Sequence, residues 1–226
     1  GLSIGQMQLA SIFMKTKKQA AASGQNLTIK LDIYKDSNSW NSEDAAKAMA
    51  GMFAEAVRVF NGVGITLTDA KGVTDPAHFS VTNVDPGETV GPSEAQREPN
   101  TIKVLFGNSA GGGSCEGGIA CSDQSTNTIT LGESDGRTIG SISDLKNAVG
   151  WGPVNQIFAH EIGHQLGLVH SGEDDNGNLL PQYENNLSAY TKDFQYTLMF
   201  NQLFKSKAAR FTDDQSIKLK SLRILP

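Results

Sequence analysis

Residues 160–170 read His-Glu-Ile-Gly-His-Gln-Leu-Gly-Leu-Val-His, and this stretch decides how the rest of the chain is interpreted. It holds three of the four histidines among 226 residues. His160 and His164 are four residues apart, so on an α-helix their rings share one face. Gly167 can adopt a positive φ at little steric cost, which ends the helix and turns His170 back toward the other two rings. The stretch therefore predicts a helix, a glycine turn and three convergent imidazoles.

Three convergent imidazoles are a ligand set for zinc that leaves a fourth position open for water. Zinc lowers the pKa of such a water from about 15.7 to about 7, and a nearby carboxylate can take the proton. Glu161 lies at the edge of the same helical face, which suits a general base. The alternative is a core helix that carries histidines by chance. It requires five fixed positions to coincide, which at this composition happens about once in 10⁵ stretches.

The pattern resembles that of the metzincin clan of zinc endopeptidases, in which a methionine-containing turn follows the long histidine motif. The resemblance implies His160, His164 and His170 as ligands of one catalytic Zn²⁺ and Glu161 as the general base. The expected reaction is hydrolysis of peptide bonds in protein or peptide substrates without a covalent intermediate. The only methionine after the motif is Met199, which the resemblance implies as the Met turn beneath the metal. An ordinary core residue is the alternative for Met199.

Two positions limit the resemblance within the clan. Asn201 stands where astacin-like and serralysin-like enzymes carry a tyrosine that reaches the metal. Ser171 is similar to matrixin-like sequences and differs from the aspartate of adamalysin-like ones. The matrixin-like proline two residues after the methionine is absent. The subfamily stays unassigned, and a divergent bacterial or reprolysin-like branch is the best match.

The resemblance implies an α/β (α+β) metzincin-like zincin fold. Its parts are a twisted mixed sheet with two long helices, one of them the active-site helix, and a small irregular C-terminal subdomain that ends in a helix. Alternating apolar residues predict a strand over residues 26–34, and Ser42 is the expected N-cap of a helix over residues 41–60. Pro153 suits the first turn of the active-site helix. Further strands are expected at residues 64–68, 101–106 and 128–131, and a closing helix with Ile217, Leu219 and Leu222 is expected after Thr212.

A chain of this length forms one domain, and no internal repeat divides it. We expect a single catalytic domain over residues 1–226, with a cleft between an N-terminal subdomain (25–170) and a C-terminal one (171–226). The first residue is glycine, which indicates a processed or trimmed form. Residues 1–24 are interpreted either as an added helix or as a propeptide remnant.

Composition narrows the classes of partner. A hydrophobic content of 38% and a net charge of −5 describe an ordinary soluble protein. The acidity is spread out, which argues against nucleic acid as a ligand. No stretch is long enough to cross a bilayer. We expect a monomer.

The two cysteines, Cys115 and Cys121, indicate a short disulfide loop, with a pair of free thiols as the alternative. The resemblance to secreted proteases favours the disulfide, and with it a secreted or extracytoplasmic location. An export signal is not part of this sequence.

Two weaker signals lie near the motif. The resemblance places the substrate-binding sheet edge within residues 119–131, where an extended peptide would add as an antiparallel strand. Residues 174–178 partly match a calcium-binding loop but lack the distal glutamate, so an ordinary Asp/Asn/Gly turn is favoured over Ca²⁺.

The competing functional class is a catalytically silent, protease-like binding module with a structural zinc. A closed fourth ligand on the metal would favour this alternative, whereas an open water position favours the enzyme.

Overall fold

The computed structural model describes residues 27–85, 98–109, 118–134, 140–201 and 209–222. Its centre is a six-stranded sheet in the order β2-β1-β4-β6-β5, with β3 also paired to β1. The strands are β1 (Leu27–Asp36), β2 (Ile65–Asp69), β3 (Val81–Val84), β4 (Thr101–Ser109), β5 (Ala120–Asp123) and β6 (Thr128–Ser134). All pairs are parallel except β5–β6, which is antiparallel. The predicted mixed α/β fold is confirmed.

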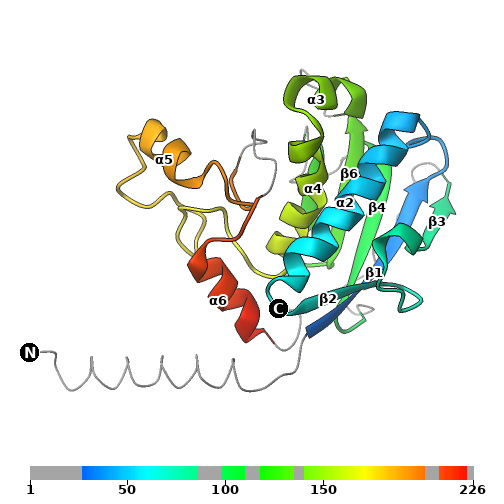
Figure 1. Cartoon of the computed structure of the whole chain (residues 1–226), viewed down its shortest axis with the longest axis horizontal. Coiled ribbons are helices and arrows are strands. Elements are labelled where there is room, and N and C mark those ends of the chain that lie inside the picture. Colours follow the sequence, from blue (N-terminus) through cyan, green and yellow to red (C-terminus); the bar gives the residue numbers. More distant parts are fainter. Residues whose placement is uncertain (1–26, 86–97, 110–117, 135–139, 202–208, 223–226) are drawn as a thin grey trace, which may run out of the picture.

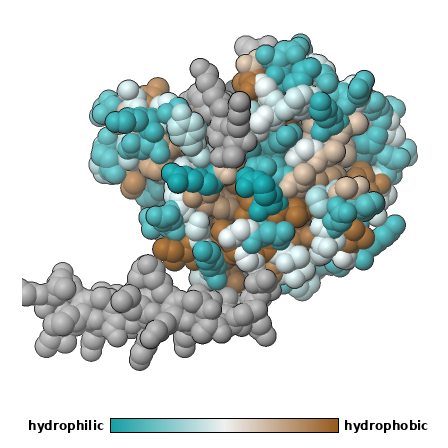
Figure 2. All heavy atoms as spheres, in the orientation of Figure 1, coloured by the Kyte–Doolittle hydropathy of each residue, from teal (hydrophilic) through white to brown (hydrophobic). Residues whose placement is uncertain are grey.

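The helices of the first part of the chain lie against one face of this sheet (Figure 1). They are α2 (Glu43–Asn61), α3 (Ile142–Val149) and α4 (Trp151–Gln165), with a short 3-10 helix, η1, at Pro76–His78. The later part of the chain adds α5 (Leu187–Phe194) and α6 (Asp213–Ser221). Figure 2 shows polar residues over most of the same face, with smaller apolar areas between them. None of the helices in the described ranges combines the length and apolarity needed to cross a membrane.

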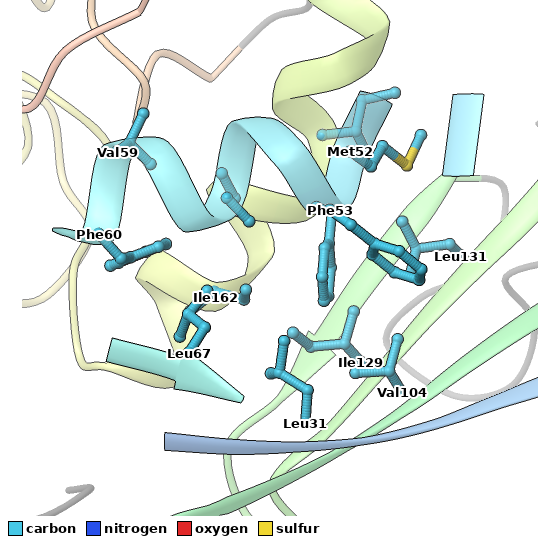
Figure 3. Close-up of a cluster of buried hydrophobic side chains, with 14 of the residues drawn as sticks. Leu31, Met52, Phe53, Val59, Phe60, Leu67, Val104, Ile129, Leu131 and Ile162 are labelled. Carbon is cyan, nitrogen blue, oxygen red and sulfur yellow. The ribbon is translucent and has the colours of Figure 1, made fainter. Parts of the chain in front are cut away.

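The core forms where the apolar side of β1 meets α2. Alternate residues of β1, from Leu27 to Ile33, are buried, as period-two spacing requires of a strand with one covered face. Ser42 caps α2 by accepting a hydrogen bond from the backbone N–H of Ala45 at 3.1 Å. Figure 3 shows the α2 side chains meeting residues of the sheet, with Ile162 of α4 in the same cluster. The packing fixes α4 against α2 and the sheet.

Sequence patterning found four of the six strands of the sheet and the helices α2, α4 and α6, and missed the other elements. The predictions for β1, α2, β2, β4 and β6 are confirmed within a few residues, and Thr212 caps α6 as expected. No helix or separate strand was predicted at β3, β5, α3 or α5. One detail of the predictions is wrong, because the closing helix stops at Ser221, before Leu222. Helix α4 begins at Trp151, where Gly150 with a φ of 82° separates it from α3, so Pro153 lies in its first turn as expected.

The end of β2 carries a fully buried carboxylate that holds the following loop. Asp69 accepts hydrogen bonds from the backbone N–H groups of Lys71 at 2.8 Å, Val73 at 2.9 Å and Ser80 at 2.8 Å. Burial acts to raise the pKa of this carboxyl, but the hydrogen bonds from Ser80, Val73 and Lys71 together outweigh it, so the pKa is lowered. The ionised form of Asp69 is therefore the form that stabilises the fold.

Replacing Asp69 with asparagine is expected to lower the free energy of unfolding by about 2–3 kcal/mol at neutral pH, because an amide nitrogen would face a backbone donor. The folded pKa lies below the unfolded value of about 3.9, so the contribution is complete above about pH 4 and is lost as pH falls through the folded pKa. Chemical denaturation at several pH values should show that the difference in unfolding free energy between Asp69→Asn and the parent narrows below pH 4. The exposed Glu184→Gln serves as the control, and a gap that stays constant with pH would contradict the assignment.

Candidate metal centre

The three histidines of residues 160–170 come together at the end of α4. Among the described residues, His160, His164 and His170 form the one group of histidine, cysteine or acidic side chains able to hold a metal, with ligand atoms within 4.8 Å of one another. The ring centroids of His160 and His164 are 4.7 Å apart, and that of His170 lies 5.4 and 4.8 Å from them. Gly167, with a φ of 82°, follows the end of α4 and turns the chain, as predicted. The helix supplies two rings and the turn returns the third.

Each ring is held through its Nδ1 atom. The Nδ1 of His160 lies 2.8 Å from the carbonyl oxygen of Leu198, and that of His164 lies 2.8 Å from the carbonyl oxygen of Leu168. The Nδ1 of His170 lies 3.1 Å from both carboxylate oxygens of Glu173. Because carbonyl and carboxylate oxygens only accept hydrogen bonds, each Nδ1 carries the proton. The Nε2 lone pairs are left for a metal.

The donor set fits zinc. Tetrahedral zinc with Zn–N distances of about 2.0–2.1 Å places nitrogen ligands about 3.3–3.4 Å apart. The Nε2 atoms of His160 and His164 are 3.1 Å apart, close to that spacing. Burial, followed by the charge of His164, lowers the pKa of His160 to about 3, and burial lowers the pKa of His164 to about 4. Both rings are therefore neutral near pH 7, which is the form that binds metal.

Glu161 is buried beside these ligands on α4, with 9% of its surface exposed. Burial raises the pKa of this carboxyl to about 7. A carboxyl group with a pKa near neutrality can both accept and release a proton, as general acid–base catalysis requires. The general-base role expected from the sequence stays a prediction.

Met199 is fully buried against the histidine-bearing helix. A Cβ atom added at Gly163 would lie 2.4 Å from its sulfur, so the thioether packs on the α4 backbone between His160 and His164. Its neighbour Leu198 accepts the hydrogen bond from His160, and the carbonyl oxygen of Met199 accepts one from the backbone N–H of Ser171 at 2.8 Å. The segment thus contacts both the helix and the turn that carry the three rings.

Replacing Gly163 with alanine is expected to lower the free energy of unfolding by about 1–2 kcal/mol, because overpacking against Met199 outweighs the higher helix propensity of alanine. The matched test is the same substitution in a Met199→Ala background, where space for the methyl group exists. There it should become neutral or stabilising by up to about 1 kcal/mol. Thermal denaturation of the parent, Gly163→Ala, Met199→Ala and the double variant measures the cost of Gly163→Ala in both backgrounds. An equal cost with and without Met199 would show that the Met199 sulfur does not lie against Gly163.

A glutamine ties the sheet edge to the active-site helix. Gln165, buried directly after His164, donates through Nε2 to the Oγ of Ser122 at 2.7 Å and to the carbonyl oxygen of Thr128 at 3.2 Å. Gln124 donates to the carbonyl oxygen of His164. Among the described residues β5 pairs only with β6, so β5 is the outer strand beside the histidines. It lies within the predicted range, but the strand that precedes the active-site helix, β6, is internal rather than the edge.

The remaining predicted sites lie farther out. Cys121, on β5, is disulfide-bonded, while Cys115 lies outside the described residues, so the pairing itself stays a prediction. The Asp174 carboxylate accepts hydrogen bonds from the backbone N–H groups of Asn176 at 2.9 Å and Asn178 at 3.0 Å. These bonds form the Asx turn favoured for this segment.

Sequence reasoning missed the partners of the ring nitrogens. The carbonyl oxygens of Leu168 and Leu198 have no side-chain signature that could have indicated them. Glu173 had one weak signal, a carboxylate three residues after the last histidine with a glycine between them. That spacing allows a tight turn in which the side chain folds back.

Comparison with known proteins gives one family and distant structural similarities. The matching family is described as metallopeptidase family M12B, reprolysin-like, and the match covers residues 6–171, nearly three quarters of the chain. It ends one residue after His170 and so leaves out Glu173 and Met199. Comparison with curated protein sequences finds no match.

Solved structures of two peptidases are among those similar to the chain. One is a zinc-dependent peptidase from Methanocorpusculum labreanum, with 11% identity, a TM-score of 0.40, and coverage of 84% of this chain and 99% of that one. The other is metalloproteinase-II from Bacteroides fragilis, with 12% identity, a TM-score of 0.43, and coverage of 86% of this chain and 54% of that one. Similarities of this size are too weak to transfer function.

Proposed function

The chain belongs to the reprolysin-like metallopeptidases of family M12B, and we propose that it is an endopeptidase whose zinc ion is held by His160, His164 and His170. That it is a zinc-dependent peptidase follows from the family. The ligand assignment is supported by the convergence of the three rings and by the Nδ1 partners that leave each Nε2 available. This convergence is the observation that carries the proposal.

The proposed reaction is hydrolysis by water. Zinc bound at this centre supplies Lewis acidity, which polarises a substrate carbonyl and lowers the pKa of a water molecule. Glu161 takes the proton of the attacking water and passes it to the leaving amine. Its burial raises its pKa to about 7, so giving up the proton again costs little near neutral pH. Met199 packs beneath the ligands, and the carbonyl oxygen of its neighbour Leu198 keeps the ring of His160 oriented.

Internal cleavage is supported by the outer strand β5. An extended peptide can pair with such a strand through backbone hydrogen bonds and continue past both sides of the scissile bond. This mode of binding needs no chain terminus. We place the substrate between the N-terminal part, residues 25–170, and the C-terminal part, residues 171–226. Two glutamines hold β5 next to the centre. Gln165 of α4 donates a hydrogen bond to Ser122 of β5, and Gln124, which follows β5, donates one to the carbonyl oxygen of His164 in α4.

An oxidising location outside the cytoplasm is part of the proposal. Cys121 is disulfide-bonded, and disulfides persist mainly in secreted and extracytoplasmic proteins. The expected partner is Cys115. Mass spectrometry of the alkylated protein with and without reductant should show two additional labels after reduction, and equal labelling would remove the disulfide from the account.

The experiment that tests the function is cleavage of a mixed peptide library by the zinc-loaded chain, read by mass spectrometry. We expect new ends at internal bonds, and no cuts after zinc is removed by a chelator. Removal of terminal residues alone would replace the endopeptidase with an exopeptidase. A chain that binds zinc and cuts nothing would favour the protease-like binding module.

A further inference from the structure

The partner of His170 differs in kind from those of the other two histidines. Backbone carbonyl oxygens accept the Nδ1 protons of His160 and His164, whereas a carboxylate accepts that of His170. Both oxygens of Glu173 lie 3.1 Å from this nitrogen. The ring held in this way is also the only one of the three that does not stand on a helix.

Glu173 also forms hydrogen bonds with the backbone of His170. Its Oε2 accepts a hydrogen bond from the backbone N–H of His170 at 3.1 Å, and its own N–H donates to the carbonyl oxygen of His170 at 3.2 Å. The residues between them form a tight turn, in which Gly172 has a φ of 81°. A type II turn requires positive φ at this third position, which glycine adopts without strain. Backbone and side chain therefore fix the same four residues.

Packing closes the turn from the outside. A Cβ atom at Gly172 would lie 2.6 Å from a ring carbon of Phe194 and 2.9 Å from one of Tyr190, so the aromatic side chains of α5 press directly on the turn. The Glu173 side chain is only 11% exposed. A carboxylate this far from water needs donors, and the ring and backbone N–H groups of His170 supply them. The contacts hold Glu173 on the far side of the ring from its Nε2.

We propose that Glu173 is a positioning residue for the metal centre: it fixes the tautomer and orientation of His170 and strengthens that ring as a zinc ligand. The inference rests on the proposed function, because it takes His170 as a ligand. A histidine that donates to a carboxylate is a more basic metal ligand, and losing such a partner typically lowers metal affinity about 10–100-fold. The effect should be large here because His170 lies in a turn and lacks the support of a helix.

The test is the zinc dissociation constant, measured by competition with a chromophoric chelator, for the parent, Glu173→Ala and Glu173→Gln. We expect Glu173→Ala to bind zinc about 10–100-fold more weakly. Glu173→Gln should recover part of the loss, because its amide oxygen still accepts a hydrogen bond. The matched control is Asp175→Asn, which removes one negative charge from an exposed position two residues away and should leave affinity unchanged.

A double-mutant cycle separates positioning from general loosening of the fold. If Glu173 acts through His170, Glu173→Ala should have no further effect on zinc affinity in a His170→Ala background. In the zinc-loaded parent, nitrogen-edited proton NMR should show a protected Nδ1–H proton of His170, and this protection should be lost in Glu173→Ala.

Parental zinc affinity in Glu173→Ala, or an equal loss in the presence and absence of His170, would overturn the inference. A parent that binds no zinc would instead refute the proposed function.

Discussion

Glu161→Gln is expected to lower kcat for peptide hydrolysis by about 10²–10⁴-fold while the protein keeps its zinc. The amide has nearly the same shape as the carboxyl group but cannot accept the proton of the attacking water. Because Glu161 acts on the transition state, KM should change far less than kcat. Steady-state kinetics on one peptide from the library, with zinc content measured by elemental analysis, provides both values.

The control for this substitution is Glu184→Gln, which removes an exposed carboxylate and should leave kcat unchanged. Two results would contradict the assigned role. A Glu161→Gln protein with parental kcat would show that another group moves the proton. A protein that loses its zinc along with its activity would make Glu161 part of the metal site rather than the base.

Removal of zinc is expected to abolish hydrolysis and to lower the thermal stability of the chain. A ligand present at 1,000 times its dissociation constant stabilises the folded state by about 4 kcal/mol, and chelation removes that contribution. Re-addition of zinc should restore both. His170→Ala should weaken zinc binding by more than the 10–100-fold that is typical of losing an outer partner, because it removes a ligand itself.

The fourth histidine offers a matched control for the third. His78, exposed beside Asp75 in the 3-10 helix η1, lies outside the group of three, so His78→Ala should leave zinc affinity and activity as they are. Equal zinc affinities for His170→Ala and the parent would remove His170 from the ligand set. The centre would then need another third ligand.

Much of the fold could be predicted because its long elements carry complete local signals. The period-two alternation of β1 and the Ser42 cap of α2 are both visible in the sequence and present in the structure. The motif of residues 160–170 likewise contains its own geometry, since the spacing of two histidines requires a helix and Gly167 requires a turn.

The missed elements have at most eight residues, so a periodic pattern has little length in which to repeat. Strand β5 has four residues and no alternation of apolar and polar types, and it exists because β6 and Gln165 hold it. In helix α5 the residues Leu187, Tyr190 and Phe194 do follow helical spacing, but the helix has only eight residues, and Leu187 is 62% exposed while Tyr190 is buried. These elements are stabilised by contacts with residues distant in sequence, which periodicity does not report.

The outer partners of the metal centre were beyond prediction for the same reason. His160 is held by a backbone carbonyl thirty-eight residues away, and any residue type could supply that group. The burial of Met199 on Gly163 also depends on how the C-terminal part folds back. Glu173 is local, but its role becomes visible only once the turn places its carboxylate on the ring of His170.

The most direct measurement is a crystal structure of the zinc-loaded chain with diffraction data collected at the zinc absorption edge. We expect a single anomalous peak among the Nε2 atoms of His160, His164 and His170, with the fourth coordination position free of protein ligands. A peak at another site, or a protein side chain that closes the fourth position, would refute the proposed zinc site.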